Sequence, residues 1–269
     1  MTFQDHKIDN LLKFADPVIA SILDKTLSGK EISVNEALVL FDANGIDFHL
    51  VGMVADNLRS KRVGDTVTYV VNRNINFTNV CIKQCGFCAF SRDFREEEGY
   101  FLPIEEILRR AKEAYHYGAS EVCIQAGLPP DMDANLYENI CKGIKSEIPN
   151  IHIHGFSPEE ILYGASRQEI SPKEYLVKLK DAGVDTIPGT AAEILNQELR
   201  DVISPGRITV KDWGDIIKTA HKQGIKSTST MMFGHLETYE AVSYTHLRAH
   251  ETPEHVGCRL VGEKKKGGG

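Results

Sequence analysis

No run of about 18 apolar residues occurs in this 269-residue sequence, so it contains no candidate transmembrane helix. The opening stretch, MTFQDHKIDNLLKFADP, is mixed and charged and lacks the apolar core of a signal peptide. The net charge is −7 and no long basic run precedes the extreme C-terminus, which disfavours nucleic acid or an anionic membrane as a partner. We therefore expect a cytoplasmic protein that binds neither.

Cysteine is also scarce, with six residues in the chain, yet three of them fall within eight residues at Cys81, Cys85 and Cys88. Clustered cysteines in a cytoplasmic protein are more often metal ligands or catalytic groups than disulfides. Three thiolates leave one iron of a [4Fe–4S] cluster open, whereas a structural zinc site needs a fourth protein ligand. The spacing alone leaves an iron–sulfur cluster, a zinc site and unconnected thiols as alternatives.

Helix signals dominate residues 1–64. Residues 16–29 begin at Asp-Pro and end at Gly, and residues 33–45 begin with Ser-x-x-Glu and end at Gly. Residues 47–65 carry apolar side chains at helical spacing. Together these segments predict a small helical cap.

Strand and helix signals alternate after the cap. The predicted strands are 66–78, 121–127, 151–156, 184–189 and 226–234, and the predicted helices are 103–118, 135–148, 171–183 and 209–224. Such β/α units argue for a parallel sheet wrapped by helices. A closed eight-fold barrel needs about 250 residues, so the sequence predicts either a barrel that lacks about three units or an open sheet.

The C-x3-C-x2-C spacing, with Phe87 before the last cysteine, resembles the signature of radical S-adenosylmethionine (SAM) enzymes. The resemblance implies a (β/α) TIM-type barrel, incomplete here at about five units, with the helical cap before it. It implies a [4Fe–4S] cluster on Cys81, Cys85 and Cys88, and SAM bound to the open iron, where its cleavage yields a 5'-deoxyadenosyl radical. Phe87 is then expected near the adenine.

The same resemblance assigns a role to the end of the second predicted strand. Gln125, Ala126 and Gly127 stand where the superfamily uses a glycine-rich turn to accept the methionine amino group of SAM. This chain has Ala126 where the family more often has glycine. Alanine fits there if its backbone φ stays negative.

Longer stretches narrow the family. NRNINFTNVCIKQCGFCAFSR, EVCIQAGLPPD, IHIHGFSPEEILYGASR, DTIPGTAAEILNQELRDVISPGRI and STSTMMFGHLET together resemble the CofH-type half of FO synthase, which makes a deazaflavin chromophore. The resemblance covers roughly Leu50 to Thr238. It implies that L-tyrosine is cleaved at its Cα–Cβ bond and that the 4-hydroxybenzyl group is added to 5-amino-6-(D-ribitylamino)uracil. It also implies a CofG-type partner enzyme that closes the ring, and an electron donor.

Two other families remain as alternatives. The menaquinone-pathway radical enzymes, aminofutalosine synthase and dehypoxanthine futalosine cyclase, share the NRNIN strand and stretches like HGFSP and FGHLET. CIKQCGFCAFSR, ILYGASR and PGTAAEIL favour the CofH type instead. A non-catalytic zinc or iron–sulfur binding module is the alternative from a different class.

Polar residues at strand ends are the candidate catalytic groups. His152 and His154 alternate with isoleucines, so both side chains are expected on one face of the third strand. We predict catalytic roles for His154, for Glu193 after the fourth strand and for His235 after the fifth. The alternatives are a hydrogen-bonded core pair for the two histidines and a helix-start carboxylate for Glu193.

The sequence also indicates roles for two arginines and two further cysteines. Arg200 and Arg207 are candidates for a substrate carboxylate, although surface ion pairs are the commoner fate of arginines. Cys123 lies in an apolar strand and Cys141 in a helix. Both are expected to be buried, small apolar residues.

The last stretch breaks the β/α pattern. The spacing typical of metal ligands occurs at His246, His250, His255 and Cys258. We do not expect a metal site there, because the family resemblance stops near residues 238–240. The remainder resembles translated adapter sequence of the kind fused to truncated gene models, and we therefore expect a longer natural protein. The predicted domains are the helical cap 1–64, the partial barrel 65–240, and a tail 241–269 that is artefactual or disordered and outside the family.

Overall fold

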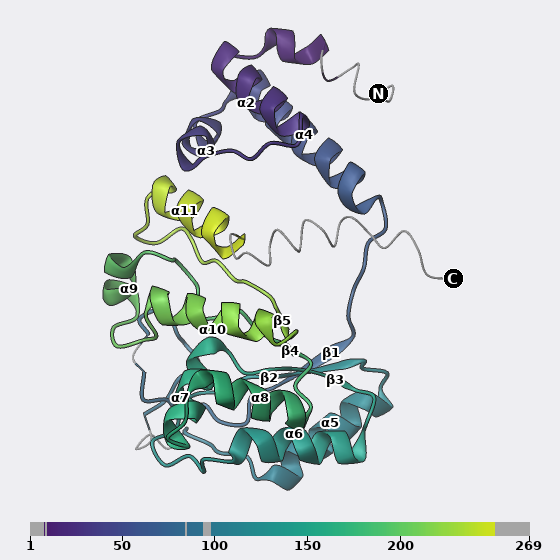
Figure 1. The fold of residues 1–269 in the computed structure, drawn as a ribbon, viewed down its shortest axis with the longest axis vertical. Helices are drawn as coiled ribbons and strands as arrows, with labels where there is room; N and C mark the ends of the chain where they lie inside the picture. The colour runs from purple at the N-terminus through teal and green to yellow at the C-terminus, as the bar shows by residue number, and fades with distance from the viewer. Residues whose placement is uncertain (1–7, 9, 84, 94–97, 251–269) are drawn as a thin grey trace. The chain divides into compact units, whose positions relative to one another are not determined.

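The computed structural model in Figure 1 describes residues 8, 10–83, 85–93 and 98–250. The chain divides into two compact units, one of Met1–Thr68 with Gly234–Gly269 and one of Tyr69–Phe233. The predicted domains, a helical cap 1–64, a partial barrel 65–240 and a tail 241–269, stay predictions.

The first unit is helical. It contains η1 Leu12–Phe14, α2 Pro17–Leu27, α3 Val34–Phe41, α4 Gly45–Val63 and α11 Tyr239–His250. The predicted helix starts are confirmed: the Asp16 carboxylate accepts from Val18 N at 2.8 Å, and Ser33 and Glu36 form a capping box at the start of α3. Buried side chains of η1, α2 and α4, such as Leu23 and Leu50, form the core of this unit.

Residues 241–250, the start of the predicted tail, continue helix α11. This helix packs against α3, and the rings of Phe41 and Tyr239 stack with their centroids 5.0 Å apart. His255 and Cys258 lie outside the described residues. The prediction that the tail does not belong to the family stays a prediction.

The second unit is a five-stranded parallel sheet with flanking helices (Figure 1). Its strands are β1 Asn72–Ile75, β2 Glu121–Ile124, β3 His152–Gly155, β4 Thr186–Ile187 and β5 Lys226–Ser227. Their order in the sheet follows the chain, β1-β2-β3-β4-β5, as in a (β/α) barrel. Within the described residues β1 and β5 do not pair with each other, so the predicted incomplete barrel is confirmed.

Six helices accompany these strands. They are α5 Ile104–His116, α6 Leu136–Glu147, α7 Pro158–Arg167, α8 Pro172–Ala182, α9 Gln197–Ile203 and α10 Val210–Lys222. The predictions missed α7 and α9. Helix α7 contains Gly164, where a Cβ would stand 2.4 Å from the Tyr175 hydroxyl of α8, so the glycine permits close packing of the two helices. None of the helices in the described part of the chain has the length and hydropathy of a membrane span.

All five predicted strands are longer than the observed ones, and the first and the fifth differ most. The segment 66–78 forms ladder pairs only over Asn72–Ile75, and Val67 and Tyr69 are 88% and 86% exposed. The segment 226–234 forms ladder pairs only at Lys226–Ser227, and Met231 makes an isolated parallel bridge with Glu193. Branched side chains favour a pleated surface, but a strand also needs a neighbouring backbone to pair with.

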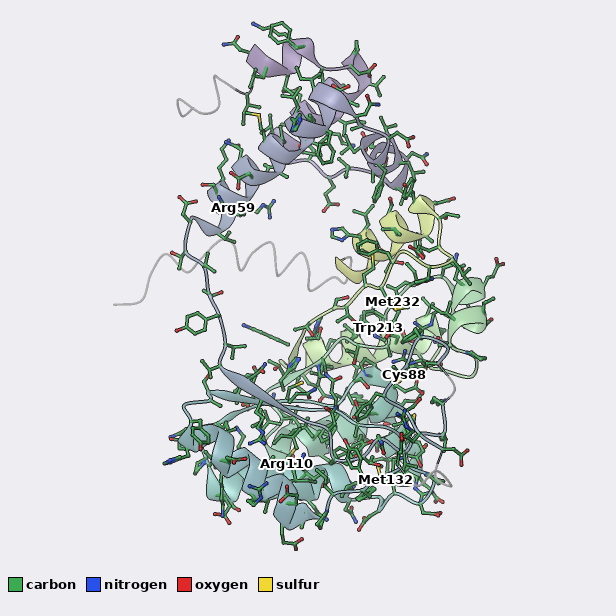
Figure 2. The ribbon with its side chains drawn as sticks, turned by 180° about the vertical axis from the view of Figure 1, so that it is seen from behind. Arg59, Cys88, Arg110, Met132, Trp213 and Met232 are labelled. Carbon is green, nitrogen blue, oxygen red and sulfur yellow. The ribbon has the colours of Figure 1, made fainter. Side chains whose placement is uncertain are left out.

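The sheet has two chemically different faces. Ile75, Val122, Ile124 and Ile153 are fully buried on the face that the helices cover. The alternate residues of each strand are polar, because successive side chains point to opposite faces. We call the face with the polar residues the inner face. Figure 2 labels Trp213 of α10. The indole N–H of this residue donates to Thr190 O at 3.1 Å.

Candidate cofactor site

The cysteine loop follows β1 and is held by backbone hydrogen bonds at both ends. Cys81 N donates to Arg92 O at 3.1 Å, and Ile82 N donates to Leu128 O at 2.9 Å. Gly86 N donates to Ile203 O at 2.8 Å, which joins the loop to the end of α9. The loop is therefore fixed against two later segments of the chain.

Gly127 permits a close approach between this loop and the end of β2. A Cβ at Gly127 would stand 2.2 Å from Val80 O and 3.1 Å from the Cβ of Cys81. Its N–H donates to Thr78 O at 2.9 Å. A side chain at this position would push the first cysteine away, so glycine is required by packing and not by a positive φ.

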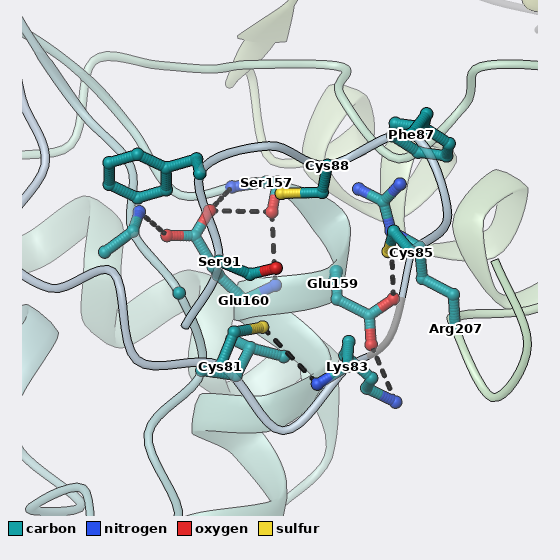
Figure 3. Close-up of a pocket in the computed structure, with 14 residues that line it drawn as sticks. Cys81, Lys83, Cys85, Phe87, Cys88, Ser91, Ser157, Glu159, Glu160 and Arg207 are labelled. Atoms are coloured by element: carbon teal, nitrogen blue, oxygen red, sulfur yellow. Dashed lines mark hydrogen bonds and ion pairs between the residues drawn. The ribbon is translucent and has the colours of Figure 1, made fainter. Parts of the chain in front are cut away.

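A cavity of about 130 Å³ opens between the cysteine loop and the ends of β2 and β3 (Figure 3). Its walls are Cys81, Lys83, Cys85, Phe87, Cys88, Phe90, Ser91, Ala126, Gly127, Leu128, Ser157, Glu159, Glu160 and Arg207. The structure thus brings together all three cysteines with three of the predicted cofactor residues. Gln125 is not among the lining residues, and its carbonyl accepts from Asn76 Nδ2 at 2.8 Å.

One wall was missed by the sequence predictions. Ser157, Glu159 and Glu160 belong to the start of α7, directly after β3. The signal was present in the sequence, because Ser-Pro-Glu-Glu after a strand is a helix start with a capping box. Ligands of parallel sheets bind at the carboxyl ends of the strands, so a helix start directly after β3 indicates a wall of the cofactor site.

Glu160 is a buried carboxyl group with three hydrogen-bond donors. Ala126 N donates to its Oε1 at 2.9 Å, and Ser157 N and Oγ both donate to its Oε2 at 2.7 Å. Burial raises the pKa of Glu160 to about 7, although these hydrogen bonds and the charge of Arg207 lower it. Glu160 therefore fixes the backbone of Ala126 at the cavity wall.

Glu159 links the cysteine loop to the start of α10. Its Oε1 lies 3.2 Å from Lys83 Nζ, and its Oε2 accepts from Ile208 N at 2.6 Å. The Arg207 guanidinium lies 5.6 Å above the Phe87 ring, a cation–π arrangement. Two cations, Lys83 and Arg207, thus stand beside the three thiols (Figure 3).

Glu193 and both predicted arginines form a second, buried layer. Arg207 Nη1 lies 3.0 Å from Glu193 Oε1, and Arg200 Nη1 lies 3.8 Å from Glu193 Oε2. Arg200 is 1% exposed and donates to the carbonyls of Ala191, Ala192 and Ile208.

The positions of these three side chains rule out two of the alternatives that the sequence left open. The surface ion-pair alternative for Arg200 and Arg207 is wrong, because both side chains are largely buried. The helix-start alternative for Glu193 is also wrong, since α9 begins at Gln197 with Asn196 as its cap.

Cys85 and Cys88 have different electrostatic surroundings. Burial raises the pKa of Cys85, although Arg207 lowers it. The pKa of Cys88 is lowered: burial opposes ionisation there, but hydrogen bonds from Ser91 and from the Phe90 backbone outweigh it. The side of the loop at Cys88 thus favours a thiolate more than the side at Cys85.

The remaining candidate residues do not line the cofactor cavity. His152 and His154 share one face of β3, as predicted, and both contact Thr186 Oγ1 at 2.7 Å. His235 belongs to the helical unit, where its Nδ1 lies 3.0 Å from Glu237 Oε2. Cys141 is fully buried, Cys123 is half-buried, and neither lines the cavity.

The residues around the cavity suit an iron–sulfur cluster in their chemistry. Three soft thiolates line one cavity, and two cations stand beside them to offset negative charge. Among the described residues, no three His, Cys, Asp or Glu side chains are grouped as ligands of a metal ion. The fit to a cluster therefore rests on the donor set and on the cavity that these donors share.

Comparison with known proteins decides the family. The sequence model described as Radical SAM superfamily matches residues 75–247. The chain belongs to the radical SAM superfamily. Members of this superfamily use a [4Fe–4S] cluster and SAM, and these are the cofactors of this radical SAM protein.

Two relatives are matched over only part of their own length. The 5-amino-6-(D-ribitylamino)uracil–L-tyrosine 4-hydroxyphenyl transferase of Methanocaldococcus jannaschii is 50% identical over 214 residues, covering 78% of this chain and 59% of that protein. The FO synthase of Streptomyces avermitilis is 46% identical over 202 residues, covering 75% of this chain and 24% of that protein. This radical SAM chain therefore spans about three fifths of the transferase's length.

A solved structure confirms the fold. Methylornithine synthase (PylB) matches with a TM-score of 0.65 and 20% identity, over 86% of this chain and 64% of that one. At this identity the similarity concerns the fold alone. It confirms the predicted radical SAM barrel, of which five β/α units are described here.

Proposed function

We propose that the protein to which this chain belongs is a radical SAM transferase that cleaves L-tyrosine and adds its 4-hydroxybenzyl group to 5-amino-6-(D-ribitylamino)uracil. The observation that carries the proposal is the 50% identity to the Methanocaldococcus jannaschii transferase over 214 residues, and the cavity that the three cysteines line agrees with it. The FO synthase relative supports the same reaction. These relatives favour this reaction over the menaquinone-pathway alternatives and over a non-catalytic module.

In this proposal Cys81, Cys85 and Cys88 hold the cluster, and SAM occupies the cavity beside it. When bound, the cluster and SAM supply the 5'-deoxyadenosyl radical that starts the reaction. Phe87 contacts the adenine, and Ala126 and Gly127 contact the methionine moiety. All six of these residues line the cavity.

The other lining residues position charge and exclude water. Lys83 and Arg207 offset the negative charge of the ligated cluster, and Glu159 holds both side chains in place. Glu160 fixes the Ala126 N–H, so the adjacent wall keeps one shape. A site with fixed dipoles and little water protects a reactive radical from side reactions.

Catalytic roles for His154, Glu193 and His235 belong to the same proposal, as does the contact of Gln125 with the methionine moiety. Glu193 has the strongest structural support, because it is buried beside Arg207 and Arg207 lines the cavity. We also propose a CofG-type partner enzyme, an electron donor for the cluster, and a cytoplasmic location.

The test is anaerobic reconstitution of this chain with iron and sulfide. SAM, dithionite, L-tyrosine and the ribityl uracil are then added, and 5'-deoxyadenosine and the coupled product are measured. Cys85→Ala should abolish both products and lower the iron content. Cys141→Ala is the matched control, because Cys141 is buried away from the cavity, and it should keep the cluster.

Three outcomes are informative. Deoxyadenosine and coupled product that vanish only in Cys85→Ala support the proposal. Turnover of a futalosine-type substrate in place of tyrosine and uracil would move the chain to the menaquinone pathway. A colourless protein that contains zinc would contradict the assignment of the three cysteines.

A further inference from the structure

A continuous row of polar side chains crosses the inner face of the sheet from β1 to β4. Asn72 Nδ2 donates to Glu121 Oε1 at 3.3 Å, and Glu121 Oε2 lies 3.7 Å from His152 Nε2. His152 Nε2 and His154 Nδ1 each lie 2.7 Å from Thr186 Oγ1. The row ends at His154, three residues before the Ser157 wall of the cofactor cavity.

The shared hydroxyl dictates how protons are placed along this row. A threonine hydroxyl has one proton to donate and lone pairs that accept. Two imidazole nitrogens at 2.7 Å from Thr186 Oγ1 therefore divide the roles when both rings are neutral: one accepts from the hydroxyl and the other donates to it. The tautomers of His152 and His154 are thus coupled through one oxygen atom.

The two histidines of the row differ in their ability to carry positive charge. Burial lowers the pKa of His154, and the neighbouring charge of His152 lowers it further, whereas Glu121 raises it. The side chain of His152 is 39% exposed and has the Glu121 carboxylate within ion-pair distance. Positive charge is therefore better accommodated on His152 than on His154.

No protein partner of His154 Nε2 is found within the described residues, and the ring faces the polar side of the sheet. His154 thus presents one nitrogen to the inner face while its other nitrogen is tied to Thr186. A neutral imidazole in this position can accept a proton from a weakly acidic N–H or O–H group.

We propose that His154, Thr186 and His152 form a proton relay that takes a proton from an N–H or O–H group of the substrate and delivers its charge to His152, beside Glu121. This inference rests on the proposed function, whose two substrates both carry such groups. It assigns Thr186 and Glu121 as positioning residues and His154 as the group that contacts the substrate.

The step balances in protons. The substrate proton goes to His154 Nε2, the Nδ1 proton of His154 moves to Thr186 Oγ1, and the hydroxyl proton of Thr186 moves to His152 Nε2. The substrate becomes its conjugate base, His154 and Thr186 are again neutral, and His152 becomes an imidazolium ion. No electron changes place and no other reactant is required.

Neighbouring groups on the same face allow this charge. Register places Cys123 of β2 beside His154 and Lys226 of β5 beside Thr186. Burial raises the pKa of Cys123, so its thiol stays neutral, and Lys226 is exposed to solvent. On β1 the residues of this face, Asn72 and Asn74, are uncharged. Glu121 is therefore the anion of the row.

The test follows the ring nitrogens of this chain by long-range ¹H–¹⁵N NMR through a pH titration, without cofactor or substrate. We expect His154 to carry its proton on Nδ1 while His152 is neutral. As His152 takes up charge, the His154 proton should move to Nε2 at the same midpoint. Thr186→Ser should keep this coupling, and Thr186→Val should abolish it. Thr219→Val, an exposed hydroxyl on α10, is the matched control and should change neither ring.

Separate midpoints for the two rings in the unaltered chain would overturn the relay, as would a His154 proton on Nε2 while His152 is neutral. Unchanged coupling in Thr186→Val would overturn it as well. A second measurement adds L-tyrosine or the ribityl uracil and follows His154 Nε2; a shift with either supports contact with the substrate. If the coupled product forms and neither compound shifts this nitrogen, the relay is wrong and the proposed function stands.

Discussion

Helices α7 and α8 begin with almost the same four residues, Ser-Pro-Glu-Glu at 157–160 and Ser-Pro-Lys-Glu at 171–174. Both starts form a complete capping box, with Ser N donating to the glutamate at 2.7 Å in α7 and 3.0 Å in α8. The first box is buried at the cofactor cavity, and the second is exposed. Local sequence therefore determines the cap, and the surrounding fold determines its chemistry.

The electrostatic consequences of the two boxes are opposite. Burial is the largest influence on Glu160 and raises its pKa to about 7. Hydrogen bonds from Ser171 are the largest influence on Glu174 and lower its pKa. One glutamate is thus destabilised as an anion by the fold, and the other is stabilised as an anion by its own helix.

Removing the two carboxyl groups gives the largest expected difference. Glu160→Ala leaves the buried N–H groups of Ala126 and Ser157 without an acceptor, so we expect a loss of about 3 to 5 kcal/mol in the free energy of unfolding at pH 5. Glu174→Ala exposes its donors to water and should cost much less. Urea unfolding of both variants measures the difference, and equal losses would contradict it.

The free energy of unfolding should depend on pH because Glu160 titrates differently in the folded and unfolded states. Its pKa rises from 4.5 to about 7 on folding, so the folded state binds the proton more tightly. Its contribution to stability is full below pH 4.5 and is lost as pH rises towards 7, by about 3 kcal/mol. Glu174 has the opposite sign: its contribution is present above its ordinary pKa and is lost as pH falls.

The measurement compares the chain with Glu160→Ala between pH 4.5 and 7. The destabilisation caused by the substitution should shrink as pH rises. A destabilisation that stays constant over this range would show that Glu160 titrates normally.

Gly127→Ala tests the close approach between the cysteine loop and the end of β2, next to the Ala126 N–H that Glu160 accepts. The new Cβ would meet Val80 O at 2.2 Å, so we expect a loss of about 1 to 3 kcal/mol, lower iron content after reconstitution, and a weaker pH effect from Glu160. Gly214→Ala is the matched control in α10, where a Cβ meets no atom within 4 Å. It should be neutral or stabilising by up to about 1 kcal/mol.

The smallest expected difference comes from the cap serines. Ser171→Ala should cost about 1 kcal/mol, as at an ordinary exposed cap. Ser157→Ala removes the same hydroxyl in a buried place, where it also donates to Glu160 at 2.7 Å, and should cost about 2 kcal/mol. Thermal unfolding of the two variants measures this difference. A larger loss of stability in Ser171→Ala than in Ser157→Ala would contradict the role of burial.

The comparison also explains what the sequence could predict. Caps, helix faces and the cysteine spacing are local, so α2, α3, α5, α6, α8 and α10 and the Cys81–Cys88 loop follow from neighbouring residues. The sequence makes Glu193 a catalytic candidate and Arg200 a candidate for a substrate carboxylate, but the burial of both side chains depends on segments brought together by the fold. The short β4 and β5 could not be delimited, because pairing depends on where the next backbone lies.

The contacts that fix the cysteine loop have a consequence for how the protein is made. Lys83 is held by the carbonyl of Gly206, which lies 123 residues later in the chain. At translation rates of about 5 to 20 residues per second, the ribosome needs roughly 6 to 25 seconds to synthesise that interval. During this time the three thiols are already on the nascent chain while their supports are not. A cluster delivered before α9 is translated would therefore meet a cysteine loop that lacks its contacts with Ile203 and Gly206.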